Sequence, residues 1–179
     1  MSMDKVAHLL GIYKLASEKG AMSLPSNPAV INMLNDLLKR EMTVVNQYMV
    51  QHAIVNDWGY DILGGALKEQ AIGEMKHAEA IMERIILLDG VPEVGQLGEV
   101  KVGKSVPEML QNNAEAEREA VHLYNQAITQ CMRLADNGTR KFLDPILADE
   151  ELHLDDTETK LDQIQKLGLP LFLTEMTTG

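Results

Sequence analysis

One pattern of acidic and imidazole side chains occurs twice in this sequence. In each half of the chain, a glutamate is followed 33 positions later by a Glu-x-x-His motif. Carboxylates combined with imidazoles are ligands that suit iron and manganese, and zinc also accepts them. The repeat therefore predicts a dinuclear metal site held by six residues: Glu41, Glu74, His77, Glu117, Glu150 and His153.

Each of these residues falls in an apolar stripe with the period of an α-helix. Residues three apart share a helical face, so the glutamate and histidine of each Glu-x-x-His motif can converge on one site. Four such stripes predict a four-helix bundle whose glutamates face the core. They run through Val30, Leu34, Leu37, Glu41, Tyr48 and Val55; through Leu63, Leu67, Glu74, His77, Ile81 and Ile85; through Leu110, Glu117, Ala120, Tyr124 and Cys131; and through Ile146, Glu150, His153, Thr157 and Leu161.

Four buried carboxylates need cations beside them. The desolvation penalty of one buried ion is several kcal/mol even after the protein relaxes. Two divalent ions would balance four glutamates, and neutral histidines would complete the ligand set without adding charge. A single Glu-x-x-His is common on solvated helix faces, but two copies at the same distance from an inward glutamate favour the metal site.

Composition agrees with one helical domain. The chain has 179 residues, of which 45% are hydrophobic and only 4% aromatic, so the core should be mostly aliphatic and methionine. A net charge of −11 argues against nucleic-acid binding. The single cysteine, Cys131, excludes an internal disulfide. No apolar run approaches the roughly 20 residues of a membrane span. We therefore expect a cytoplasmic protein that binds neither nucleic acid nor membrane.

Capping and turn residues predict where the helices lie. Asn27 before Pro28 predicts a helix over residues 28–57, and a second helix should reach about Asp89, where Gly90 ends it. The glycine-rich segment 90–104 is long enough to cross the bundle, so the second and third long helices should run parallel.

The second half of the chain predicts two more long helices. Ser105 begins the third, which should end near residue 135. The fourth begins either at the turn 136–138 or at Asp144, because Pro145 inside a helix costs about 3 kcal/mol. A short turn or helix follows over residues 171–176. Residues 1–25 predict an extension with a short amphipathic helix that needs an apolar surface to pack on, and residues 26–179 form the bundle domain.

Several segments between residues 28 and 173 resemble bacterioferritins. The likeness includes all six expected ligands, and it implies an all-α, ferritin-like four-helix bundle with a long crossover and a short C-terminal helix. The segments that carry it are Val30-Ile31-Asn32, Asn46-Gln47-Tyr48, Asp57-Trp58-Gly59, Glu74-Met75-Lys76-His77-Ala78, Glu83-Arg84-Ile85, Asp149-Glu150-Glu151 and Leu161-Asp162-Gln163-Ile164-Gln165-Lys166.

The resemblance implies a ferroxidase that stores iron and removes its toxicity. Such a protein oxidises Fe(II) to Fe(III) with O2 or H2O2 at a site for two iron ions, and it deposits ferric mineral inside a cage of 24 identical subunits. A ferredoxin reductant would be a partner for iron release. By this likeness Glu41 and His77 hold one iron, Glu117 and His153 hold the other, and the bridging carboxylates are Glu74 and Glu150.

Two further residues gain roles from the resemblance. Tyr48 would hydrogen-bond to a bridging carboxylate and supply an electron; the alternative is a core tyrosine with a satisfied hydroxyl, which is the preferred interpretation of Tyr124. Met75 would ligate a b-type haem shared by two subunits, one haem per dimer; the alternative is packing. Met75 belongs to a second stripe that predicts a subunit contact: Lys68, Ala71, Ile72, Met75, Met82 and Ile86.

Other functions remain open at this point. Glu69 and Gly73 stand where bacterioferritins often have a histidine and an aspartate that help iron to reach the cavity, so that route is predicted to be altered. A rubrerythrin-like peroxidase or a dimanganese catalase would use similar ligands, although the cysteine-rich module usual in the former is missing. A haem-binding electron-transfer or scaffold dimer with a non-catalytic dinuclear site is the remaining alternative.

Overall fold

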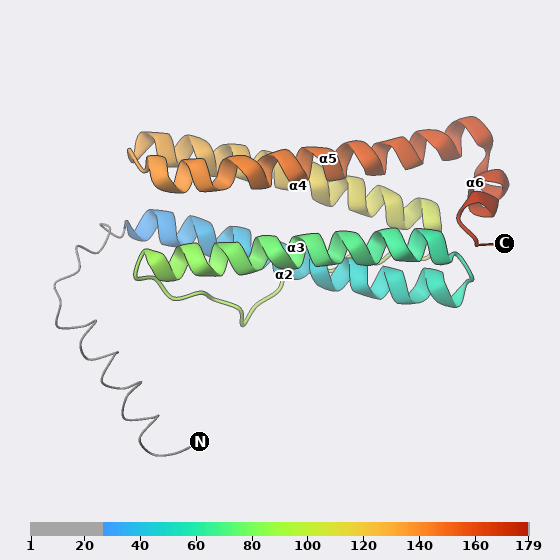
Figure 1. Cartoon of the computed structure of the whole chain (residues 1–179), viewed down its shortest axis with the longest axis horizontal. Coiled ribbons are helices and arrows are strands. Elements are labelled where there is room, and N and C mark those ends of the chain that lie inside the picture. The colour runs from blue at the N-terminus through green and yellow to red at the C-terminus, as the bar shows by residue number, and fades with distance from the viewer. Residues whose placement is uncertain (1–26, 179) are drawn as a thin grey trace, which may run out of the picture.

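The computed structural model describes residues 27–178, and all regular secondary structure within them is helical (Figure 1). The four long helices form two antiparallel hairpins: α2 packs mainly against α3, and α4 mainly against α5. The predicted N-terminal amphipathic helix lies outside the described residues. The helices are α2 (Pro28–Asp57), α3 (Asp61–Leu87), α4 (Val106–Arg133), α5 (Asn137–Leu167) and α6 (Leu169–Glu175).

Polar side chains cap three of the long helices. Asn27 accepts a hydrogen bond from the backbone N–H of Ala29 at 3.0 Å, as its position before a proline predicted. Ser105 caps α4. Asp136 caps α5 and accepts from the N–H of Thr139 at 2.9 Å, so this helix begins at the earlier of its two predicted starts. Pro145 therefore lies inside α5.

Two helix boundaries differ from the sequence prediction. Helix α3 ends at Leu87, two residues earlier than expected, and Asp89 rather than Gly90 has the positive φ, 56°. Gly90 is needed for a close approach instead, because a Cβ there would lie 2.9 Å from Cγ2 of Ile85. The terminal helix α6 begins at Leu169, two residues before the predicted start.

A row of polar side chains on α2 holds the long crossover between α3 and α4. Asn35 bonds to backbone groups of Val91 and Glu93, and Thr43 accepts from the N–H of Gly98 at 2.8 Å. Further along, Gln47 and Gln51 bond to the backbone of Lys101 and Val102, each at 2.9 Å. The crossover returns the chain to the far end of the bundle, so α3 and α4 run parallel, as predicted (Figure 1).

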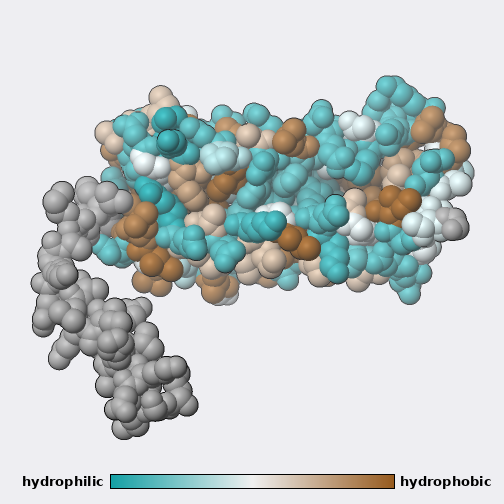
Figure 2. All heavy atoms as spheres, in the orientation of Figure 1, coloured by the Kyte–Doolittle hydropathy of each residue, from teal (hydrophilic) through white to brown (hydrophobic). Residues whose placement is uncertain are grey.

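Two apolar clusters make up the core, one toward each end of the bundle. The first includes Leu38, Ala78, Ala120 and Ile146, and the second includes Val44, Ala71, Leu110 and Phe172. Along each long helix, the predicted metal ligands fall between the residues of these clusters. The visible surface is mostly hydrophilic, with separate hydrophobic groups of side chains (Figure 2). None of the described helices has the length and apolarity needed to cross a bilayer.

Candidate metal centre

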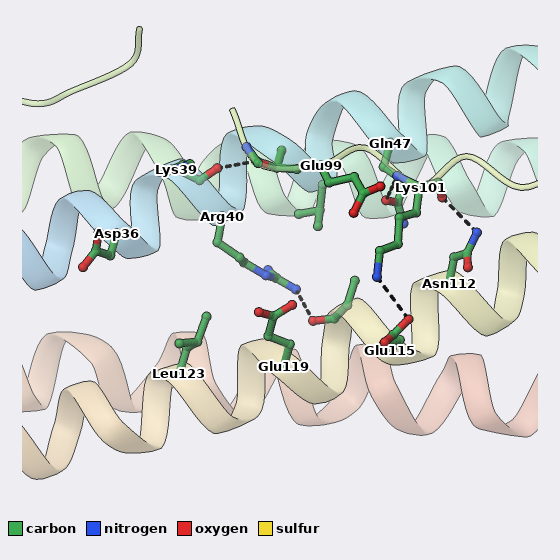
Figure 3. A pocket seen from close by; sticks show the side chains of 14 residues that line it. Asp36, Lys39, Arg40, Gln47, Glu99, Lys101, Asn112, Glu115, Glu119 and Leu123 are labelled. Atoms are coloured by element: carbon green, nitrogen blue, oxygen red, sulfur yellow. Dashed lines mark hydrogen bonds and ion pairs between the residues drawn. The ribbon is translucent and has the colours of Figure 1, made fainter. Parts of the chain in front are cut away.

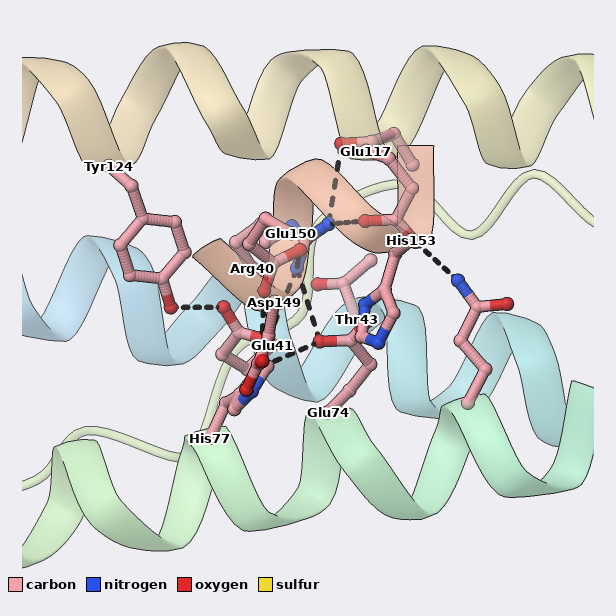
Figure 4. A network of polar contacts seen from close by, with 12 residues as sticks. Arg40, Glu41, Thr43, Glu74, His77, Glu117, Tyr124, Asp149, Glu150 and His153 are labelled. Atoms are coloured by element: carbon pink, nitrogen blue, oxygen red, sulfur yellow. Dashed lines mark hydrogen bonds and ion pairs between the residues drawn. The ribbon is translucent and has the colours of Figure 1, made fainter. Parts of the chain in front are cut away.

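The four predicted glutamates meet at the middle of the bundle, one from each long helix (Figure 4). All four are fully buried, with 0% exposure. Together with the two predicted histidines they form two groups, and within each group one ligand atom per residue lies within 4.8 Å of the others. Glu74 and Glu150 belong to both groups. The groups are Glu41, Glu74, His77 and Glu150, and Glu74, Glu117, Glu150 and His153.

Each histidine points its Nδ1 atom into the site. Nδ1 of His77 lies 3.1 Å from carboxylate oxygens of both Glu74 and Glu150. Nδ1 of His153 lies 3.0 Å from Oε1 of Glu74. His77 thus contacts the glutamates of both Glu-x-x-His motifs, and His153 contacts the glutamate of the motif on the opposite hairpin. The spacing of three residues brings the glutamate and the histidine of each motif to the same centre.

Both tyrosines of the predicted stripes donate hydrogen bonds to glutamates of the opposite hairpin. The Tyr48 hydroxyl donates to Glu117, and the Tyr124 hydroxyl donates to Glu41 at 2.5 Å. The expected bond from Tyr48 to a carboxylate shared by both groups is therefore wrong, because Glu117 belongs to one group only. Tyr124 has a satisfied hydroxyl, as expected, but its acceptor is one of the candidate ligands.

Arg40 extends into the centre among all four glutamates, and no sequence pattern had pointed to it. Its Nη1 atom lies 3.1 Å from Glu41, 3.2 Å from Glu150 and 3.5 Å from Glu74. Its Nη2 atom lies 2.7 Å from Glu117. Burial acts to lower the pKa of Arg40, but the surrounding carboxylates raise it above its usual value. The guanidinium is therefore a permanent positive charge inside the centre.

A second residue that the sequence did not single out as functional supports His77. Oδ2 of Asp149 lies 3.2 Å from Nε2 of His77, the ring atom that faces away from the glutamates. Such outer carboxylates fix the ring orientation of metal-binding histidines. The equivalent position before the first Glu-x-x-His is Gly73, where a Cβ would lie 3.9 Å from Nε2 of His153. Among residues 27–178, no side chain bonds to that Nε2 atom.

Burial and neighbouring charges change the proton affinities of the ligands. Burial raises the pKa of Glu41 to about 8 and that of Glu150 to about 9, against the attraction of Arg40. Burial acts to lower the pKa of His77, but hydrogen bonds to Glu150 and Glu74 raise it to about 11. Burial acts to raise the pKa of Glu74, but its histidine contacts and Arg40 hold it well below the usual range. The negative charge of the four glutamates is thus reduced in two ways, by bound protons and by the positive charge of Arg40.

The donor set fits a pair of metal ions. Among the described residues, Oε1 of Glu74 and Nδ1 of His153 are buried and make no hydrogen bond although they lie 3.0 Å apart, and buried Oε2 of Glu150 has only its ion pair with Arg40. Each glutamate that the two groups share thus has a buried oxygen that no hydrogen bond satisfies, and a metal ion would satisfy it. Four carboxylates and two imidazoles suit iron or manganese.

Met75 lies outside this centre, on the outer face of α3. Its side chain is 52% exposed, and exposed Ile72 and Ile86 lie on the same helix. Ala71, which the sequence placed in this stripe, is buried in the bundle core, and Met82 is partly buried against that core. The exposed stripe is therefore narrower than predicted, but it includes Met75.

Comparisons with known proteins agree with this geometry. The sequence profile of the family described as "Ferritin-like domain" matches residues 31–167. The chain is 37% identical to the bacterioferritin of Brucella melitensis over 81% of its length and 90% of that protein. It is 38% identical to the bacterioferritin of Streptomyces coelicolor, over 84% and 90% of the two chains. It is 32% identical to bacterioferritin BfrA of Mycobacterium tuberculosis, over 83% and 94%. With these matches and its buried Glu/His centre, the chain belongs to the bacterioferritins of the ferritin-like family.

Proposed function

We propose that the protein is a ferroxidase that oxidises Fe(II) and stores the product as ferric mineral. The observation that carries this proposal is the pair of overlapping Glu/His groups, which share two glutamates in a fully buried centre. Its bacterioferritin relatives support the same function. Two Fe(II) ions bound together would supply the two electrons that reduce O2 to peroxide or H2O2 to water.

The residues have separate roles in this scheme. Glu41 and His77 would bind one Fe(II), Glu117 and His153 would bind the other, and both ions would share Glu74 and Glu150. Tyr48, which donates to Glu117, would orient that carboxylate and is near enough to supply an electron.

The proposed assembly is a cage of 24 identical subunits in the cytoplasm, with a ferredoxin as reductant for iron release. The exposed apolar side chains of α3 support the subunit contact that such an assembly needs. Met75 on this face would ligate one b-type haem together with Met75 of a second subunit. Expression with added haem should give a Soret band that Met75→Ala removes and Met82→Ala, a partly buried methionine on the same helix, retains. No Soret band in the unmodified protein would contradict this role.

Two adjacent glutamates on α5 offer a test of the ferroxidase proposal. Glu150 is fully buried in the centre, whereas Glu151 is exposed. Glu150→Gln should abolish the fast phase of Fe(II) oxidation under O2 and reduce the number of ions bound per chain. Glu151→Gln should leave both unchanged. Fast oxidation by Glu150→Gln at the normal rate would overturn the proposal.

One observation favours a second candidate, a scaffold dimer whose dinuclear site is vestigial and no longer binds metal. The guanidinium of Arg40 occupies the space between the carboxylates that a metal pair would use. In a scaffold this ion-pair network would be permanent, and the unmodified protein would bind no divalent ion at the centre. Calorimetric titration of the chelator-treated protein with Zn²⁺ separates the two functions, because only the ferroxidase should bind two ions per chain.

A further inference from the structure

One positively charged side chain spans both groups of candidate ligands. Nη1 of Arg40 contacts Glu41, Glu74 and Glu150, and Nη2 contacts Glu117. The second hairpin has no counterpart, because the residue before Glu117 is Ala116. The carbonyl of Ala116 instead accepts a hydrogen bond from Nη2 at 3.3 Å. A single guanidinium thus balances part of the charge of all four glutamates.

This position of Arg40 is incompatible with metal ions on the same oxygens. A metal ion binds a carboxylate oxygen at roughly 2.0–2.2 Å, so it would lie within a few ångströms of the guanidinium. Two positive charges at that distance repel each other strongly in a buried site, where water screens them poorly. The guanidinium and the metal pair must therefore use the centre at different times.

A pocket beside the centre offers the guanidinium another location (Figure 3). It has a volume of about 400 Å³, lies between α2, α4 and the crossover, and includes Arg40 in its wall. Its acidic residues are Asp36, Glu99, Glu115 and Glu119, and among the described residues only Glu115 of these four forms an ion pair, with Lys101. Three carboxylates are thus available to receive a displaced positive charge, and two of them, Asp36 and Glu119, lie on the helices α2 and α4.

The path into this pocket is short. Asp36 precedes Arg40 by four residues on α2, which is the spacing at which oppositely charged helical side chains pair. Glu119 lines the pocket from α4. Nε of Arg40 is buried and has no hydrogen-bond partner in the described chain, so only the contacts of Nη1 and Nη2 hold the guanidinium in the centre. A change of side-chain rotamer moves the charge without moving either helix.

We propose that Arg40 is a built-in counter-ion that alternates with the metal ions. Its guanidinium neutralises the four glutamates while no metal is bound, and it withdraws to Asp36 and Glu119 when two divalent ions enter. The inference rests on the proposed function, since it needs a centre that binds metal. It makes Arg40 a residue that sets metal affinity rather than a ligand.

The first experiment removes the competing charge. Chelator-treated protein is titrated with Zn²⁺, which has no redox chemistry, and heat and stoichiometry are measured. The unmodified protein should bind two ions per chain, and Arg40→Leu should bind two ions about tenfold more tightly or better. Lys39→Leu is the matched control, because Lys39 lines the same pocket but contacts none of the glutamates; its affinity should change less than about twofold.

A second readout concerns the protein without metal. Because Arg40→Leu leaves buried carboxylates without their counter-ion, the chelator-treated variant should have a lower Tm than the unmodified protein, and Zn²⁺ should raise its Tm by more. If Arg40→Leu binds Zn²⁺ no more tightly than the unmodified protein, the inference is wrong while the ferroxidase proposal stands. If only the variant binds Zn²⁺, Arg40 is a permanent block, and both proposals fall.

A double-mutant cycle tests where the guanidinium goes. Asp36→Asn combined with Glu119→Gln removes the receiving charges, so Zn²⁺ binding should weaken about threefold or more in the presence of Arg40. The same pair of changes should have no effect in the Arg40→Leu background. Equal weakening in both backgrounds would show that the pocket acts on incoming cations directly, which would contradict the proposed movement.

Discussion

The protons on the candidate ligands connect metal binding to pH. Glu41 and Glu150 have pKa values raised to about 8 and 9, and His77 has one raised to about 11. At neutral pH these groups therefore hold protons that metal ions must displace. Metal binding should release protons, and affinity should increase as pH rises.

Stability should depend on pH in the opposite direction when metal is absent. Groups whose folded-state pKa exceeds the unfolded value bind more protons in the folded state, so the free energy of unfolding falls as pH rises between the two values. For Glu41 and Glu150 that interval runs from 4.5 to about 8 or 9, and for His77 it runs from 6.5 to about 11. The Tm of chelator-treated protein should therefore decrease from pH 5.5 to pH 9. With saturating Zn²⁺ the decrease should disappear, since the ions replace the protons. A Tm that rises over this range without metal would contradict the assignment.

The unequal support of the two histidines gives a second prediction. Gly73→Asp would place a carboxylate near Nε2 of His153, as Asp149 does for His77, and the added Cβ meets no clash. Because such outer partners change metal affinity by about 10–100-fold, the weaker Zn²⁺ step should tighten by about tenfold. Gly65→Asp adds the same charge to α3 where a Cβ contacts nothing within 4 Å, and it should have no such effect. Equal results from the two variants would mean that only net charge matters.

The sequence could predict the six candidate ligands because repetition and helical period both mark them. It could not predict Arg40, since the residue before Glu41 lies about 100° away around the helix and only a long side chain brings its charge back to the centre. Asp149 also lies one position away from its ligand stripe, and its contact with His77 depends on how α3 and α5 pack together. The acceptor of Tyr48 depends on how the two hairpins pack together, which no pattern within one helix records.

At the scale of helices, local signals predicted most boundaries. Asn27, Ser105 and Asp136 each cap a helix with a side-chain oxygen. The end of α3 differed, because Asp89 takes the left-handed conformation that a glycine normally provides. Pro145 was ambiguous from sequence, since its cost inside a helix is offset only by packing that the whole bundle supplies.

Gly103, at the end of the crossover, has a φ of 85° and lies against the first turn of α4. A Cβ there would lie 2.9 Å from the backbone nitrogen of Met109, which cannot move without disturbing the helix. Gly103→Ala should therefore lower the free energy of unfolding by about 1–3 kcal/mol, measured by urea denaturation. Gly95→Ala is the control, because a Cβ at that crossover position contacts nothing within 4 Å. A loss of stability equal to that of Gly95→Ala would show that α4 adapts.

At the scale of the molecule, the exposed apolar face of α3 predicts how subunits associate. Ile86 is 60% exposed and Met75 is 52% exposed. Ile86→Glu should dissociate the assembly, because a charge in an apolar contact is costly, whereas the fold of each subunit should persist. If the proposed cage of 24 chains of 19.9 kDa forms, light scattering should give roughly 480 kDa for the unmodified protein and for Ile86→Leu. The glutamate variant should give a much smaller mass. An unchanged mass for Ile86→Glu would place the interface elsewhere.

The hydrogen bonds between α2 and the crossover also limit how the centre can change shape. Asn35, Thr43, Gln47 and Gln51 fasten a connecting segment along the same helix that carries Arg40 and Glu41. Sliding or rotating this helix would break all of these hydrogen bonds together. The helix backbone should therefore stay in place while only the side chains reorient. Loading and unloading of cations should consequently leave amide hydrogen exchange along residues 35–51 slow and nearly unaltered.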